Sequence, residues 1–299
     1  MTYTAGAPVT VGVDGSPASL KAVAWAAGEA NRHGRSLNLV YANSWPAYTY
    51  AMWPSWGPSD GRDGRVAGHE VLLDAANRAA LAEPATLVTT EIIDGGPASV
   101  LLGRAEGSAL LVVGRSGVGG FVELLIGSVA AQAVTYARCP VAVIPATASA
   151  VDSGGADTSA PGIVLGVDGS QACQAAIAYA FAEASMRGLP VTAVRSWYWP
   201  SDDPAIVEPF PPLAEDHLAE QQRLLSEALV GWSEKYPDVT VRHLVTHHRP
   251  ARALLDAARG ADVLVVGARG NGGFEALLLG SVGETVIRHA TCPVVVVRA

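Results

Sequence analysis

Short apolar runs alternate with longer amphipathic or alanine-rich segments along the first half of the chain. The apolar runs predict strands at 9–13, 36–43, 86–93, 109–113 and 141–144. The segments between them predict helices at 17–32, 65–81, 98–106 and 127–137. Strict alternation of strands and helices favours right-handed βαβ units. The pattern therefore predicts an α/β fold, with a parallel sheet covered by helices on both faces.

The second half of the chain repeats the first. Residues 267–298 match residues 114–145 at roughly half of the positions, which is far above chance. VTVGVDGSPAS, starting at Val9, returns as IVLGVDGSQAC, starting at Ile163. We therefore expect two similar domains at 1–146 and 162–299. Residues 147–161 are small, polar and rich in Gly and Ser, as expected for a flexible linker.

Composition narrows the class of protein. A length of 299 residues suits about two domains, and a net charge of −8 disfavours nonspecific nucleic-acid or anionic-membrane partners. The longest apolar runs have the length of strands, so we expect no membrane span. Three scattered cysteines indicate a reducing compartment. Because the first residues lack a signal-peptide pattern, the expected location is the cytoplasm.

A glycine motif follows the fourth predicted strand of each half. In open parallel sheets, ligands bind at the carboxyl ends of the strands. We expect the first two glycines to adopt positive φ and to approach a ligand closely, and the last Gly-Ser pair to open a helix whose amides attract phosphate. The alternative is a glycine turn before an ordinary helix cap. The motif is neither a Walker A loop nor a dinucleotide fingerprint. Its residues are Gly114, Gly117, Gly127 and Ser128, repeated at the same spacing as Gly267, Gly270, Gly280 and Ser281.

An aspartate follows the first strand of each half. Asp14 and Asp168 are placed to bond ligand hydroxyl groups or to help hold Mg²⁺, or else they are purely structural. Ser16, before Pro17, is expected to cap a helix.

The two halves differ after their third strands. Asp94-Gly95-Gly96-Pro97 in the first half corresponds to His247-His248-Arg249-Pro250 in the second. We expect the histidine pair to lie in a solvated loop. If the turn faced a ligand, Arg249 would contact phosphate and the second site would be the more cationic. The aromatic segments 45–56 and 197–199, with Phe210, are expected to be loops that either pack on their own domain or form a lid or partner surface.

VGVDGS, then VVGxxGxGGFxxLLxGSV, then CPVxVx resembles the universal stress protein family, in its tandem, ATP-binding branch. The resemblance implies Rossmann-like, flavodoxin-type domains with strand order 3-2-1-4-5, ATP with Mg²⁺ or Mn²⁺, and pairing through the last strands, within the chain or between chains. Ala42 and Ser196 match the position whose backbone meets adenine. The implied nucleotide residues are Asp14, Ala42, Gly114, Arg115, Gly117, Gly127, Ser128 and Val129, and then Asp168, Ser196, Gly267, Arg269, Gly270, Gly280, Ser281 and Val282.

Two departures from the family pattern put equal affinity of the two sites in doubt. Arg269 stands before the second glycine of its loop, where the first half has Ser116 beside Arg115. Gly96 precedes the third-strand proline in the first half, where the second has Arg249.

The sequence leaves three candidate functions, which we give in order of preference. The first is an ATP-binding stress-response regulator that acts through conformation or an unknown protein partner. The second is an ATP-using transferase or slow ATPase, for which the sequence offers no convincing catalytic set. The third is a nucleotide-free dimerisation scaffold, against which the intact glycine motifs argue.

Overall fold

The computed structural model describes residues 6–44, 62–117, 126–146, 162–198, 214–270 and 279–298. The chain divides into two compact units, Thr2–Ala146 and Thr147–Ala299, which we call the N-terminal and C-terminal units. The proposed linker, residues 45–56 and Phe210 lie outside the described residues. None of the helices within the described ranges is long and apolar enough to cross a membrane.

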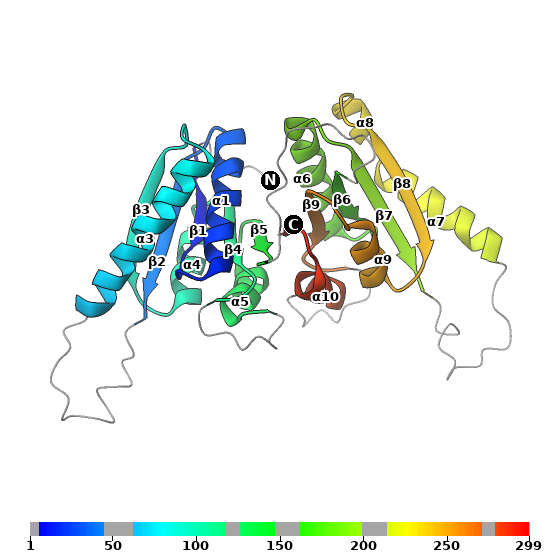
Figure 1. Cartoon of the computed structure of the whole chain (residues 1–299). Coiled ribbons are helices and arrows are strands. Elements are labelled where there is room, and N and C mark those ends of the chain that lie inside the picture. The colour runs from blue at the N-terminus through cyan, green and yellow to red at the C-terminus, as the bar shows by residue number, and fades with distance from the viewer. Residues whose placement is uncertain are drawn as a thin grey trace, which may run out of the picture. The chain divides into compact units, whose positions relative to one another are not determined.

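The N-terminal unit is a five-stranded parallel sheet with strand order β3-β2-β1-β4-β5 (Figure 1). Val9 pairs with Leu37 on one side and Leu110 on the other, so β1 is central. This order confirms the predicted topology. The direction in which successive strands are added to the sheet reverses between β1 and β4. The strands are β1 (Val9–Gly12), β2 (Leu37–Asn43), β3 (Val88–Asp94), β4 (Leu110–Gly114) and β5 (Val141–Ile144).

Two pairs of helices cover the N-terminal sheet. Helix α1 packs beside α3, and α4 packs beside α5. All predicted helices occur, although α3 begins three residues before its expected start. The helices are α1 (Pro17–Arg32), α3 (Arg62–Ala82), α4 (Pro97–Ala105) and α5 (Ser128–Tyr136).

The C-terminal unit repeats this architecture, with strand order β8-β7-β6-β9-β10 (Figure 1). Its strands are β6 (Ile163–Gly166), β7 (Val191–Trp197), β8 (Val241–His247), β9 (Val263–Gly267) and β10 (Val294–Val297). Its helices are α6 (Gln171–Arg187), α7 (Ala214–Ala228), α8 (Trp232–Lys235), α9 (Pro250–Ala257) and α10 (Ser281–His289). The short helix α8 has no counterpart among the predicted elements.

Serine caps start the first helix of each unit, as predicted. Ser16 Oγ accepts a hydrogen bond from the Ser19 amide at 3.2 Å, and Pro17 occupies the first helical turn. Ser170 Oγ accepts from the Cys173 amide at the same distance. These bonds satisfy an amide that has no partner within the helix, and they set where α1 and α6 begin after the central strands.

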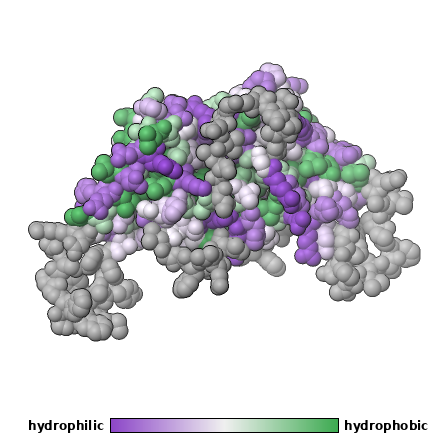
Figure 2. All heavy atoms as spheres, in the orientation of Figure 1, coloured by the Kyte–Doolittle hydropathy of each residue, from purple (hydrophilic) through white to green (hydrophobic). Residues whose placement is uncertain are grey.

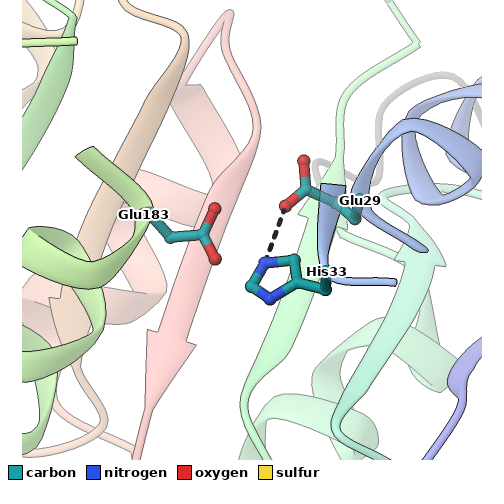
Figure 3. A group of neighbouring side chains, drawn as sticks. All are labelled: Glu29, His33 and Glu183. Carbon is teal, nitrogen blue, oxygen red and sulfur yellow. Dashed lines mark ion pairs between the residues drawn. The ribbon is translucent and has the colours of Figure 1, made fainter. Parts of the chain in front are cut away.

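Hydrophilic and hydrophobic residues are interspersed on the face drawn in Figure 2. Charged pairs also form along helices with their carboxylates buried. In α1, Glu29 pairs with Arg32. Its Oε2 also lies 3.8 Å from His33 Nε2, the pair that the dashed line marks in Figure 3. In α6, Glu183 Oε2 accepts from Arg187 Nε at 3.1 Å. Both pairs are spaced by about one helical turn, the separation at which side chains of a helix meet.

Helix α8 covers a large side chain that only the C-terminal unit possesses. Phe181 in α6 is fully buried, with its ring 5.6 Å from the ring of Trp232 and 6.0 Å from that of Tyr236. The corresponding residue of α1 is Ala27, which is also fully buried. A phenyl ring at this position needs more apolar cover than a methyl group does, and Trp232 and Tyr236 supply it.

We expect Phe181→Ala to lower the free energy of unfolding of the C-terminal unit by about 3–5 kcal/mol, because it leaves a cavity beside α8. Urea unfolding followed by circular dichroism measures this change. Phe181→Leu, which retains most of the apolar volume, is the matched control and should cost much less. An alanine variant as stable as the parent would contradict this account of α8.

Candidate functional site

A cavity of about 450 Å³ opens at the carboxyl ends of β1, β2 and β4. It lies where the strand order reverses, the usual ligand position in such sheets. Every predicted nucleotide residue of this half except Arg115 lines it. The predicted residues brought together there are Asp14, Ala42, Gly114, Gly117, Gly127, Ser128 and Val129.

The Asp14 carboxylate connects the first-strand turn with the glycine loop. Its Oδ1 accepts a hydrogen bond from the Ser16 amide at 2.9 Å across Gly15, which has a φ of 80°. Its Oδ2 lies so close to Gly117 that a Cβ at that glycine would overlap it. One oxygen therefore supports the turn, as the structural alternative proposed, while the other faces the loop that was expected to hold phosphate.

The same arrangement occurs in the C-terminal unit. Asp168 Oδ1 accepts from the Ser170 amide at 2.9 Å, and Gly169 has a φ of 82°. A Cβ at Gly270 would overlap Asp168 Oδ2. The duplicated motifs thus have the same local geometry.

The expected positive φ at the first two loop glycines was wrong. Neither Gly114 nor Gly117 is among the described glycines with positive φ. Gly114 instead permits close packing, since a Cβ there would lie 2.9 Å from the carbonyl carbon of Ala18 and 3.0 Å from the Ser19 nitrogen. The first turn of α1 and the Asp14 carboxylate, rather than backbone torsion, exclude side chains from these two positions.

The end of the loop opens a helix, as predicted. Gly127 is the N-cap of α5 with φ −72° and ψ 152°, and Gly280 is the N-cap of α10 with φ −75° and ψ 151°. Gly127, Ser128, Val129 and Ala130 all line the cavity. The first amides of a helix lack partners within the helix, so this segment is suited to an anion.

Arg115 contributes through its backbone. Its amide donates to the Ile144 carbonyl at 2.8 Å, and its carbonyl accepts from the Gly127 amide at 2.7 Å. Its side chain is not among the described groups that line the cavity, and burial lowers the pKa of its guanidinium. Arg115 thereby joins the two ends of the glycine loop to the end of β5.

The C-terminal residues occupy the equivalent places in their own unit, with some differences. Ser196, in β7, donates its hydroxyl to the His248 carbonyl. Ser170 Oγ donates to the Arg269 carbonyl at 3.3 Å. The remaining predicted residues follow the strands and open the last helix, as in the first unit. They are Asp168 after β6, Gly267 at the end of β9, Arg269 and Gly270 after it, Gly280 as N-cap, and Ser281 and Val282 in α10.

Sequence reasoning missed several residues that line the N-terminal cavity. Two of them are Ser19, the third residue after the N-cap of α1, and Ser44, the residue that follows β2. In the sequence, only these positions relative to the cap and the strand distinguish the two serines. Leu101 comes from α4 and lies against the central strand, since a Cβ at Gly12 would lie 2.5 Å from its Cδ1. No local pattern places this leucine at the site, because its position depends on how α4 packs.

Ser19 and its counterpart differ in chemistry. Where the first unit has Ser19 at the cavity, the second has the buried Cys173. Burial raises the pKa of the Cys173 thiol. Cys139 and Cys292 are buried free thiols whose pKa burial raises to about 11. All three are therefore poorly reactive at neutral pH.

The turns after the third strands differ as the sequence suggested. Asp94 accepts from Asn43 Nδ2 at 2.8 Å and pairs with Arg65, and these two groups lower the pKa of its carboxyl. His247 is not in a loop, as was expected, but ends β8 and stacks on Trp197 with ring centroids 4.9 Å apart. Trp197 itself ends β7, where a loop was also expected.

Gly114→Ala is expected to destabilise the N-terminal unit by about 1–3 kcal/mol, because backbone atoms of α1 leave no room for a methyl group. Urea unfolding measures the loss. Gly103→Ala in α4 is the matched control, since no atom lies within 4 Å of its added Cβ. That change should be neutral or stabilising. Equal stability of Gly114→Ala and the parent would show that α1 does not require this glycine.

Comparison with known proteins identifies the family of this chain. The family model of the universal stress protein family matches residues 7–145 and again 162–298. A universal stress protein of Mycolicibacterium smegmatis is 37% identical over 297 residues, which cover 97% of this chain and 96% of that protein. One from Mycobacterium tuberculosis is 36% identical over 302 residues, with the same coverage. A universal stress protein structure from Archaeoglobus fulgidus superposes with a TM-score of 0.69 at 17% identity, covering 99% of each chain. The chain belongs to the universal stress protein family and carries two of its domains in tandem.

Proposed function

We propose that this chain is an ATP-binding regulator of the stress response, with one nucleotide site in each unit. The observation that carries the proposal is the cavity of the N-terminal unit around which Asp14, Ala42, the glycine loop and the start of α5 converge. Its volume of about 450 Å³ lies within the range of about 300–1,000 Å³ typical of small-molecule sites.

The chemistry of the lining suits a nucleoside triphosphate. The backbone amides and the Ser128 hydroxyl at the start of α5 provide hydrogen-bond donors for phosphate. The positive end of the helix dipole also favours phosphate there. Ala42 lies in β2, two strands away from β4, the strand that precedes the glycine loop. It offers backbone polar groups to the edge of a base. ATP carried with Mg²⁺ or Mn²⁺ would bring the phosphate charge and the metal together, and Asp14 is the carboxylate placed to hold that metal or a ribose hydroxyl.

Regulation, rather than rapid turnover, fits the cavity better. Among its described lining residues, Asp14 is the only titratable side chain. One of its oxygens already accepts the Ser16 amide. General acid–base catalysis needs a titratable side chain within reach of the reacting atoms, and the described lining offers Asp14 alone for that role. Nucleotide occupancy would then act by favouring one conformation of the loop over others.

We expect the purified full chain to bind two equivalents of Mg·ATP, because the motif geometry is duplicated. Isothermal titration calorimetry and mass spectrometry of released nucleotide measure this. Gly117→Ala and Gly270→Ala should each remove one equivalent, because the added Cβ displaces the Asp14 or Asp168 carboxylate from its loop. Gly103→Ala should bind as the parent does. Absence of heat and of nucleotide in the parent would refute the proposal.

We also expect steady ATP turnover well below ~1 s⁻¹, the low end for working enzymes. Release of inorganic phosphate from Mg·ATP measures it. The matched variant is Asp14→Asn with Asp168→Asn, in which the amide oxygens still accept the Ser16 and Ser170 amides. Turnover above ~1 s⁻¹ in the parent, abolished in this variant, would instead favour an ATP-using enzyme.

A further inference from the structure

Helix α3 of the N-terminal unit packs on β2 and β3 with one face and exposes the opposite face. Leu72, Ala75 and Ala79 are buried on the inner face, as expected for a helix that covers a sheet. The outer face should then be polar, yet it carries three large apolar side chains. These are Val66, Leu73 and Leu81, which are 58%, 65% and 82% exposed.

Two exposed polar side chains, Glu70 and Asn77, lie between the apolar ones. Together the five residues form a row in which neighbours are three or four positions apart, so they share one side of the helix. This is the spacing at which one helix packs along another. We call this row the α3 seam. Its members are Val66, Glu70, Leu73, Asn77 and Leu81.

The α3 seam complements itself when its direction is reversed. Val66 and Leu81 are equally far from its midpoint, which falls between residues 73 and 74, and so are Glu70 and Asn77. On an antiparallel second α3, Val66 therefore meets Leu81 of the second copy, and the two Leu73 side chains meet at the centre. Glu70 meets Asn77 of the second copy, where the carboxylate accepts a hydrogen bond that the amide group donates.

The C-terminal unit has no such row. Its helix α7 ends at Ala228, whereas α3 continues seven residues beyond the corresponding position, to Ala82. Arg223 of α7 pairs with Glu220 and Glu227 of its own helix. The fold therefore does not require exposed apolar side chains at these positions. The residues that correspond to the α3 seam are Ala219, Arg223, Ser226, Val230 and Glu234.

We propose that the α3 seam is an interface at which two copies of this chain associate, with their α3 helices antiparallel about a two-fold axis. A two-fold interface uses the same surface on both copies, and the order of apolar, acceptor and donor side chains in the α3 seam meets that requirement. The polar pair fixes the register, because a shift by one turn would place Glu70 against an apolar side chain. None of the five residues is among the described residues that line the nucleotide cavity.

The expected association is weak and reversible. The α3 seam is about 22 Å long at ~1.5 Å per residue. One pair of helices of this length gives an interface at the low end of specific complexes, below about 1,200 Å².

Sedimentation equilibrium of the full chain measures the association. We expect the parent to form a dimer reversibly as its concentration rises. Leu73→Ser, which introduces the residue found at Ser226, should raise the dissociation constant about tenfold or more, because each dimer loses two buried leucines. Val230→Ser removes an exposed apolar side chain from the C-terminal unit and should associate as the parent does.

Two outcomes of this measurement would overturn the proposal. A parent that remains monomeric up to about 1 mM would leave the α3 seam to a partner of different sequence. A dimer that Leu73→Ser leaves unchanged would have to form through another surface, such as the last strands.

An exchange of the polar pair tests the antiparallel register. Asn77→Glu should weaken the dimer about tenfold or more, because it sets two carboxylates against each other. Glu70→Asn combined with Asn77→Glu should restore the parent affinity, because donor and acceptor then only change places. Val230→Glu adds the same charge at the corresponding position of the C-terminal unit and should have no effect. A combined variant as weak as Asn77→Glu would contradict the pairing of residue 70 with residue 77.

Cross-linking tests the position of the two-fold axis. Leu73→Cys should form a disulfide between copies in oxidised glutathione, because the axis brings the two positions together within the reach of a disulfide. Val66→Cys should not, because its two copies lie about 22 Å apart along the helices. The three native cysteines are buried and contribute no cross-link of their own. Equal cross-linking of both variants, or of neither, would exclude this arrangement.

Discussion

The carboxylate after the central strand sets the geometry of each site. Asp14 holds the first turn through the Ser16 amide and at the same time lies against Gly117. A buried parallel strand delivers this carboxylate to the sheet edge, and the capped α1 then leaves the edge in a defined direction. The glycine loop must therefore pass between a helix and a carboxylate, and only residues without side chains fit there.

The pattern of apolar runs was enough to predict the strands and most of the helices of the first half, because these follow from local periodicity and turn residues. The strand order came instead from the resemblance to the universal stress protein family. The reason for the glycines was not predictable in the same way. Gly114 and Gly117 suggested positive φ, but contacts with Ala18 and Asp14 explain them. Such contacts join residues about a hundred positions apart, and no spacing within a single loop encodes them.

The same limit explains the other missed features. Leu101 reaches the site only through the packing of α4 on β1, and α8 covers Phe181, where the first unit has an alanine. His247 was expected in a solvated loop. Pairing of β8 with β7 extends as far as His247 opposite Trp197, and the two rings then stack. A tertiary contact overrides the local preference at this position.

Duplication lets one domain serve as a reference for the other. Glycine loops, aspartate turns and helix starts are the same in both units, so the features that the units share belong to the fold. The features that differ cluster at Tyr198 and the β8 turn, with Cys173 and Phe181 as separate changes inside the unit. Of these changes, Phe181 is explained by packing, because the rings of Trp232 and Tyr236 cover it.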